Sequence, residues 1–231
     1  MEKEALQLTG EVISIANSSD PYPCIETKNK LTRNCLKILS QHDCLIQIVT
    51  KSNIVTRDID LLTKLTCTVS LTITTDDDLL ASLIEPNAPL PSERLKAIEK
   101  LVAHDIPVSV RVDPIIPLLN DKPDRLIAKL SDLGVKHITT SIYKVKLDNW
   151  KRFSEKLPNI SKRIKPLYFE RGKKIGTYFY LQKDLRLKIL KNIKYIVQKK
   201  GMSFSVCREG FLSLNTASCD GQSLFPSNRG K

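Results

Sequence analysis

The stretch Leu45–Leu62, LIQIVTKSNIVTRDIDLL, decides the fold class of this chain. It begins with an apolar run at 45–49 that is typical of a buried β-strand, and a short polar turn follows at 50–53. Residues 56–62 then indicate the start of a helix, because acidic side chains in a first turn favour the positive end of the helix dipole. A strand, a tight turn and a helix in this order predict one βα unit of a parallel sheet.

Lys51 lies at the junction between this strand and this helix. In parallel α/β folds, ligands bind beyond the carboxyl ends of the strands, and a cationic side chain there can hold an anionic ligand. Lys51 is therefore a candidate ligand-binding residue, and the alternative is an ordinary loop lysine. An ion pair with Asp20, in the turn after the preceding strand, would make Lys51 structural.

The whole chain has the composition of a globular protein. Its 231 residues are 41% hydrophobic, which is enough for the core of one α/β domain. No apolar run reaches the roughly 18 residues that a membrane-spanning helix needs, so we expect no membrane partner. The N-terminus lacks the basic and apolar regions of a signal peptide, and we expect a cytoplasmic protein.

The six cysteines show no metal-binding spacing. Neither CxxC nor CxxxCxxC occurs among them, so the sequence predicts no zinc ribbon, no cluster-binding loop and no metal ligands in this chain. In a protein without an export signal we expect reduced thiols. Cys44 and Cys67 border apolar strands and are expected to lie in the core.

The positive charge is concentrated in one segment. Residues 144–200 carry 18 Lys+Arg and 4 Asp+Glu, a net charge of +14, whereas residues 1–143 carry 16 Lys+Arg and 19 Asp+Glu, a net charge of −3. A basic face of this kind favours a polyanionic partner, DNA or RNA first. The alternative is a lysine-rich solvated surface of the kind found in thermophile proteins.

Strand patterns alternate with helix patterns along most of the chain, which is typical of parallel βαβ units. Most of the strands lack a clean polar alternation, as buried parallel strands should. The expected strands are 12–16, 45–50, 67–73, 107–113, 137–142 and 202–207. The expected helices are 31–39, 57–65, 93–104, 121–133 and 184–200, with a helical region to 161 and a loop at 168–180.

The segments that follow the strands carry hydroxyls, one lysine, one arginine and two carboxylates. These groups suit a small zwitterionic or phosphate-bearing ligand. The sequence contains no glycine-rich phosphate loop and no legible catalytic triad, and we expect its three histidines to be structural. The candidate groups are Ser18, Ser19, Asp20, Tyr22, Thr50, Lys51, Ser52, Arg111, Asp113, Ser141 and Tyr143, with Ser70 and Thr72 inside the third strand.

Blocks of the sequence, in order and at matching spacing, resemble the radical S-adenosylmethionine (SAM) proteins of the spore photoproduct lyase and "DNA repair photolyase" type. The resemblance covers about residues 10–221, nearly the whole chain. The blocks are SSDPYPCIETKNKLTRNCLKIL (18–39), IVTKSNIVTRDIDLL (48–62), VSLTI (69–73), EPNAPLPSERLKAI (85–98), VRVDPIIPLLND (110–121) and CREGFLSLNTASCDG (207–221).

The resemblance implies an α/β fold, an incomplete βα barrel of the TIM type with mostly parallel strands. In such enzymes SAM binds across the strand ends, and a [4Fe–4S] cluster cleaves it to a 5′-deoxyadenosyl radical. Three cysteines in a CxxxCxxC loop after the first strand hold that cluster, and this chain has no such loop. We therefore expect residues 1–207 to form a partial barrel that begins within its first helix, followed by an irregular tail at 208–231.

Site residues are implied at a few matching positions. Ser19, Lys51 and Ser70 match the residues that hold the methionine moiety of SAM, and Asp20 follows in the same turn. The hydrogen-donor cysteine of the lyase falls near Asn17, which has no thiol, and this puts the thymine-dimer reaction in doubt.

Two functions follow as hypotheses. The first is a photolyase-like radical SAM protein that is inactive alone because the cluster loop is missing, unless another chain supplies it. The second is a non-catalytic βα domain that binds nucleic acid through residues 144–200. For either function we predict that Lys188, Lys191 and Lys194 share a positive face on the last helix.

Overall fold

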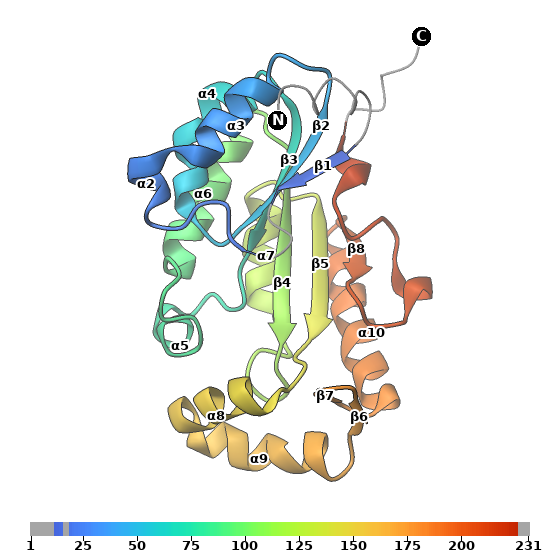
Figure 1. The fold of residues 1–231 in the computed structure, drawn as a ribbon. Helices are drawn as coiled ribbons and strands as arrows, with labels where there is room; N and C mark the ends of the chain where they lie inside the picture. Colours follow the sequence, from blue (N-terminus) through green and yellow to red (C-terminus); the bar gives the residue numbers. More distant parts are fainter. Residues whose placement is uncertain (1–11, 16–18, 226–231) are drawn as a thin grey trace.

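The computed structural model describes residues 12–15 and 19–225 of the chain and contains a sheet of six parallel strands (Figure 1). The strand order is β1-β2-β3-β4-β5-β8, and each neighbouring pair runs in the same direction. The strands are β1 (Val12–Ile15), β2 (Leu45–Thr50), β3 (Thr66–Thr72), β4 (Val108–Ile115), β5 (His137–Ile142) and β8 (Ser203–Val206).

The two outer strands, β1 and β8, do not pair with each other in the described part of the chain, so the sheet stays open. Consecutive neighbours in the sheet are also nearly consecutive in sequence, and helices fill the crossovers between them. A partial barrel requires such a succession of βα units, in which each strand pairs with the next strand of the sheet along the chain. The predicted incomplete α/β barrel is therefore confirmed.

The start of α6, one of the helices that connect the strands, has a clear local cause. Pro91 opens α6 because a first-turn proline loses no helical hydrogen bond, so α6 begins two residues before the predicted start at 93. The connecting helices are α2 (Glu26–Asn29), α3 (Leu31–Leu39), η1 (Asn53–Asp58), α4 (Ile59–Leu62), α5 (Asp78–Ile84), α6 (Pro91–Val102) and α7 (Asp124–Asp132).

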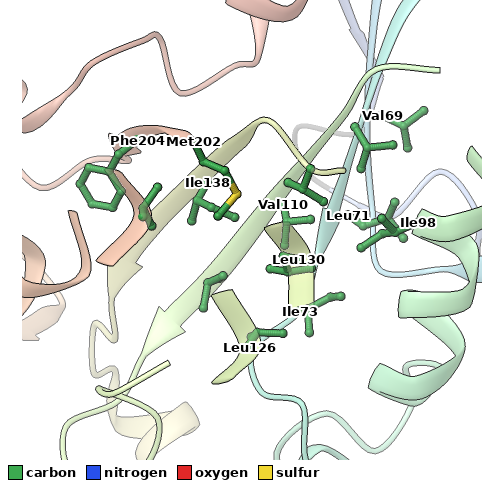
Figure 2. Close-up of a cluster of buried hydrophobic side chains, with 14 of the residues drawn as sticks. Val69, Leu71, Ile73, Ile98, Val110, Leu126, Leu130, Ile138, Met202 and Phe204 are labelled. Atoms are coloured by element: carbon green, nitrogen blue, oxygen red, sulfur yellow. The ribbon is translucent and has the colours of Figure 1, made fainter. Parts of the chain in front are cut away.

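The main hydrophobic core lies between the sheet and its helices. On β3 and just beyond it, Val69, Leu71 and Ile73 are fully buried, and Figure 2 shows them beside Ile98 of α6. Successive residues of a strand face opposite sides, so the alternate residues of β3, which include Ser70, line the other face. β3 is an exception to the expectation that most strands lack polar alternation, because its inner face is buried yet polar.

The region after β5 is more regular than the sequence predicted. Two helices, α8 (Leu147–Lys156) and α9 (Pro158–Phe169), precede a hairpin of β6 (Lys173–Ile175) and β7 (Tyr178–Tyr180), where a loop was expected. Gly172 permits this turn, because a Cβ there would lie 2.2 Å from the carbonyl oxygen of Tyr168. The long helix α10 (Lys183–Lys199) then returns to the sheet and contacts β5 and β8.

The segment after β8 contains two short 3-10 helices, η2 (Leu212–Leu214) and η3 (Gln222–Leu224), and it packs on the sheet. The Phe204 amide donates to Thr216 Oγ1 over 2.8 Å, and the Gln47 side chain donates to the carbonyl oxygen of Asp220. The tail therefore crosses from β8 to β2 over the polar inner face.

Two expectations lie outside the described residues: the partial first helix near the N-terminus and the position of Asn17. Within the described residues, no helix is both long and apolar enough to cross a membrane.

Candidate functional site

Hydrogen bonds to Asp20 join the turn after β1 to the carboxyl end of β2. Its carboxylate accepts from the Thr50 hydroxyl (2.6 Å), the Lys51 backbone N–H (2.7 Å) and the Tyr22 backbone N–H (2.9 Å). The carboxylate thus fixes the backbone on which Lys51 stands. Asp20 is a structural residue of this edge in addition to being a sequence-predicted ligand residue.

The Lys51 side chain pairs with Glu85 rather than with Asp20. Lys51 Nζ and Glu85 Oε1 are 2.6 Å apart, and the other carboxylate oxygen of Glu85 lies 2.8 Å from Nη2 of Arg94. The structural alternative that placed a Lys51–Asp20 ion pair here is therefore wrong. Asp20 is already occupied by neutral donors, whereas Glu85, at the end of α5, faces the ammonium.

Arg94 holds the Glu85 carboxylate in place from the interior of the protein. Its side chain is 0% exposed, and it also donates to the carbonyl oxygens of Thr72 and Pro89, each over 2.8 Å. Burial alone would raise the pKa of Glu85, but the charges of Lys51 and Arg94 and a hydrogen bond from Thr74 hold it below its usual value. Glu85 is therefore ionised at neutral pH, and it positions the Lys51 ammonium.

A cavity of about 510 Å³ opens beside the Lys51–Glu85 ion pair, between α5 and α8 beyond the ends of the central strands. Its size falls within the usual range for small-molecule sites. One end carries both charges of the Lys51–Glu85 pair, and the walls are largely apolar. The other lining residues are Thr74, Leu83, Ile84, Pro86, Asn87, Pro114, Ile116, Tyr143, Asn149, Arg152, Phe153, Glu155 and Lys156.

The two predicted serines differ in their surroundings. Ser70 is 3% exposed on the inner face of β3, where it pairs in register with Val49, two residues before Lys51. No other described residue hydrogen bonds to its hydroxyl, so this group is free to meet a ligand. Ser19 is exposed just before Asp20. The fold therefore brings Asp20, Lys51 and Ser70 to one edge, and Ser19 to its rim.

Other charges of the same sequence blocks serve the architecture. Asp58 is completely buried, and its carboxylate lies 2.8 Å from both Arg33 and Arg57; Arg57 also reaches Glu26 over 2.9 Å. Burial would raise the pKa values of Asp58 and Glu26. The guanidinium groups of Arg57 and Arg33 hold the pKa of Asp58 below its usual value, and Arg57 together with backbone N–H groups at the start of α3 does the same for Glu26. This cluster ties α2 and α3 to η1 behind the edge.

Sequence reasoning missed Glu85, Arg94 and Glu209. Glu209, just after β8, accepts from the Ile142 backbone N–H and pairs with Lys144 (2.9 Å) and Arg186 (2.7 Å). Glu85 and Arg94 lie in the quoted block 85–98, but their nine-residue separation crosses a proline-rich turn and indicates no contact by itself. The one available signal is that each is a charged residue between apolar stretches.

The cysteines of the described chain do not fit an iron–sulfur cluster. Cys44 and Cys67 are buried in the core, Cys24 is exposed and Cys35 lies in α3. Across residues 12–15 and 19–225, no group of three or more His, Cys, Asp or Glu side chains could hold a metal ion. The charge pair and the hydroxyls at the strand edge, in contrast, do fit the amino-acid end of SAM.

The first part of the basic segment 144–200, from α8 to the hairpin, lies at the same end of the sheet as the cavity. Figure 1 shows α8 and α9 beyond the ends of β4 and β5, with the hairpin beside them and α10 along the outer strand. Lys188 and Lys191 are exposed on α10, and Lys194 is half-buried. At the hairpin, the ammonium of Lys146 lies 4.7 Å from the ring centre of Tyr178.

Sequence comparisons find two curated relatives. An uncharacterized protein of Methanocaldococcus jannaschii is 38% identical over 110 residues, which are 47% of this chain and 42% of that protein. An uncharacterized protein of Acidianus two-tailed virus is 30% identical over 137 residues, 56% of this chain and 45% of that protein. The aligned regions cover less than half of each relative, and no protein-family model matches the chain.

Solved structures resemble the chain over most of its length. A mutant spore photoproduct lyase with bound AdoMet (SAM) and dinucleoside spore photoproduct has a TM-score of 0.66 and 15% identity, covering 88% of this chain and 62% of that one. SuiB of Streptococcus suis bound to S-adenosylmethionine has a TM-score of 0.54 and 11% identity, covering 85% and 39%. The described part of this chain therefore has the fold of two radical SAM enzymes, spore photoproduct lyase and SuiB, as an open, partial βα barrel.

Proposed function

We propose that this chain is the SAM-binding barrel of a radical SAM protein of the photolyase-like branch, which acts on nucleic acid. The observation that carries the proposal is the edge of an open parallel sheet where the Lys51–Glu85 pair lines a cavity, with the buried Ser70 on the neighbouring strand in register with Val49. A lyase of the same fold was solved with AdoMet and a dinucleoside photoproduct. Because this chain matches only 62% of that lyase, the whole protein's activity is part of the proposal.

The amino-acid end of SAM carries a carboxylate and an ammonium, and the site offers a partner for each. Lys51 would hold the carboxylate, while Glu85, ionised by Arg94, would accept from the ammonium. Binding would exchange an internal ion pair for two contacts with the ligand. The hydroxyls of Ser70 and Ser19 would add neutral hydrogen bonds.

When bound, SAM supplies an activated sulfonium whose carbon–sulfur bond can be broken. The chain's own residues bind and orient the amino-acid end, and the apolar cavity wall excludes water from it. Because the described cysteines do not fit a cluster, the proposal includes a partner chain or segment that supplies cluster ligands.

The nucleic-acid part of the proposal depends on segment 144–200. The segment carries a net charge of +14, and its part from α8 to the hairpin lies at the same end of the sheet as the cavity, so a polyanion bound there would pass close to the SAM site. Half-buried Tyr178 and Tyr180 on the hairpin offer rings on which bases could stack.

Calorimetric titration of the chain with SAM tests the proposal. Lys51→Ala removes a charge-assisted contact of about 1.5–3 kcal/mol, so binding should weaken on the order of 10- to 100-fold. Ser70→Ala should weaken binding by roughly 2- to 10-fold, the effect of one neutral hydrogen bond, with little change in the melting temperature. Lys64→Ala, an exposed lysine at the end of α4, is the matched control and should bind as the wild type does.

The same titrations separate binding from structure. Loss of thermal stability in Lys51→Ala, together with no SAM binding by the wild type, would leave Lys51 as the structural partner of Glu85 alone. Equal affinity of the Ser70→Ala and wild-type proteins would remove Ser70 from the site.

The second candidate function is a non-catalytic βα domain that binds nucleic acid. The concentration of basic residues in 144–200 favours it independently of the cavity. Salt-sensitive binding of DNA or RNA, with no response to SAM, would select this function over the first.

A further inference from the structure

The structure brings together two cysteines that are twelve residues apart in sequence. Cys207 follows β8, and Cys219 lies in the tail that crosses the inner face of the sheet. The Cys207 thiol is close enough to the Cys219 thiol to influence its ionisation, and both residues are half-buried. The other four described cysteines lie elsewhere in the fold. Cys24 is exposed before α2, Cys35 lies in α3, and Cys44 and Cys67 are in the apolar core.

The backbones of both cysteines are fixed to the same strand, β5. The Cys207 N–H donates to the carbonyl oxygen of Thr140 over 2.9 Å, and the Thr139 hydroxyl donates to the carbonyl oxygen of Cys219 over 3.3 Å. Adjacent residues of β5 therefore fix the backbone at Cys207 and at Cys219. The proximity of the thiols therefore depends on how the tail after β8 packs on the sheet.

A cation completes the surroundings of the pair. The guanidinium of Arg111, which is 2.9 Å from Asp113, lies near the Cys207 thiol. Burial and the neighbouring thiol raise the pKa of Cys219. A nearby guanidinium stabilises negative charge on sulfur when a thiol loses its proton, which is the first requirement for attack on an oxidant.

We propose that Cys207 and Cys219 form a redox-active pair that hydrogen peroxide converts to a disulfide. One thiolate attacks a peroxide oxygen, the O–O bond breaks, and a sulfenic acid and water are formed. The second thiol displaces water from that sulfenic acid and forms the S–S bond. In balance, two thiols and one hydrogen peroxide give one disulfide and two waters, with sulfur oxidised and peroxide reduced.

The disulfide would lock the tail onto the sheet. It would close the loop from 207 to 219, and the residue after Cys219 already joins β2 through the bond from Gln47. A loop of this size stabilises a fold mainly by restricting its unfolded chain, by an amount that corresponds to a rise in melting temperature of roughly 6–12 °C. Oxidation would thus hold the tail over the polar inner face.

Peptide mapping of the intact chain tests the proposal. The native protein is treated with stoichiometric hydrogen peroxide, remaining thiols are alkylated, and the protein is digested with trypsin. Because Arg208 separates the two cysteines, we expect a disulfide-linked pair of peptides, 201–208 and 209–229. The melting temperature should rise on oxidation and return on reduction.

Two serine variants make the result specific. Cys207→Ser should give neither the linked peptides nor the oxidation-dependent melting shift, whereas Cys24→Ser, at an exposed cysteine, should give both. The proposal fails if native wild-type protein forms no 201–208/209–229 linkage, or if peroxide stops at separate sulfinic acids on the two residues. The mapping of the wild-type chain decides this even if Cys207→Ser does not fold.

Discussion

The charges in the strand-edge region, residues 20–113, differ in placement from those in the basic segment, residues 144–200. In the first, Asp58 and Arg94 are completely buried, and each has an oppositely charged partner within 2.8 Å. In the second, only Lys144, Arg152 and Arg186 pair with an acid among the described residues, and most of the other cations are exposed.

This difference teaches that charged residues in a recognisable sequence block need not contact a ligand. A buried charge must be paired, so the strand-edge charges first build the edge and only then offer Lys51 and Glu85 to a cavity. Exposed cations contribute little to folding and remain available to a polyanion. Substitutions in the two regions should therefore affect different measurements.

The largest expected effect on stability is that of Arg94→Met. The substitution removes the Arg94 partner of one carboxylate oxygen of Glu85 and of the carbonyl oxygen of Thr72. Removing one member of a buried ion pair costs about 3–5 kcal/mol, so the free energy of unfolding should fall by that amount in denaturant titrations. The matched control is Arg125→Met, whose side chain is 73% exposed beside Asp76, and it should cost less than about 1 kcal/mol. Equal losses in the two variants would contradict the comparison.

The next effect concerns His137, which is completely buried beneath the tail. Burial lowers its pKa to about 4, against an ordinary value of 6.5. Between these values the unfolded chain binds more protons than the folded one, so stability should fall as pH drops from about 7 to 4. The contribution of this group is on the order of 3 kcal/mol.

Denaturant titrations at several pH values measure this contribution. His137→Gln should lose the part of the pH dependence that lies between pH 4.5 and 7, whereas His104→Gln, at an exposed imidazole, should keep it. An unchanged profile in His137→Gln would show that the imidazole takes up its proton without opening the fold.

A smaller effect, on binding alone, is expected in the basic segment. Reversing the charges of Lys188, Lys191 and Lys194 should weaken DNA or RNA binding and flatten its dependence on salt, because fewer counterions are released. The free energy of unfolding should change little, since two of these lysines are exposed and none is in an ion pair. Affinity and salt slope equal to those of the wild type would place the polyanion elsewhere.

The smallest expected signal is that of an iron–sulfur cluster in this polypeptide alone. Anaerobic reconstitution with iron and sulfide should give no stable [4Fe–4S] spectrum, because no three cysteines share a loop and the described residues form no metal-binding group. A spectrum with three or four irons per chain would overturn this prediction. Binding of SAM through Lys51 can be measured separately in the same preparation.

Much of the fold was predictable because its signals are local. The strand at 137–142 was predicted with the bounds that the structure has, and the long helix was predicted within one residue of α10. The hairpin at β6 and β7 was missed, since three-residue strands on an exposed, basic sequence carry almost no period-two pattern. The edge position of Lys51 was also predictable, because strands in parallel sheets end on one side.

The partners of the site residues could not be read in the same way. The structural alternative for Lys51 was an ion pair with Asp20, but its ammonium meets Glu85, thirty-four residues away, because α5 places that carboxylate opposite the end of β2. The same holds for Cys207 and Cys219, whose contact depends on a tail that crosses the sheet. No sequence pattern reports which of several carboxylates or thiols a crossing chain will bring into contact.

The α/β class, the succession of strands and helices along the chain and the uneven distribution of charge could be read from the sequence alone, because hydrophobic periodicity and composition are properties of neighbouring residues. Only tertiary packing determines which charges are buried in pairs, which side-chain hydroxyls on the inner face lack a protein partner, and which cysteines become neighbours. Those outcomes depend on packing between segments that are far apart in the chain, where desolvation and the pairing of each buried polar group select one arrangement.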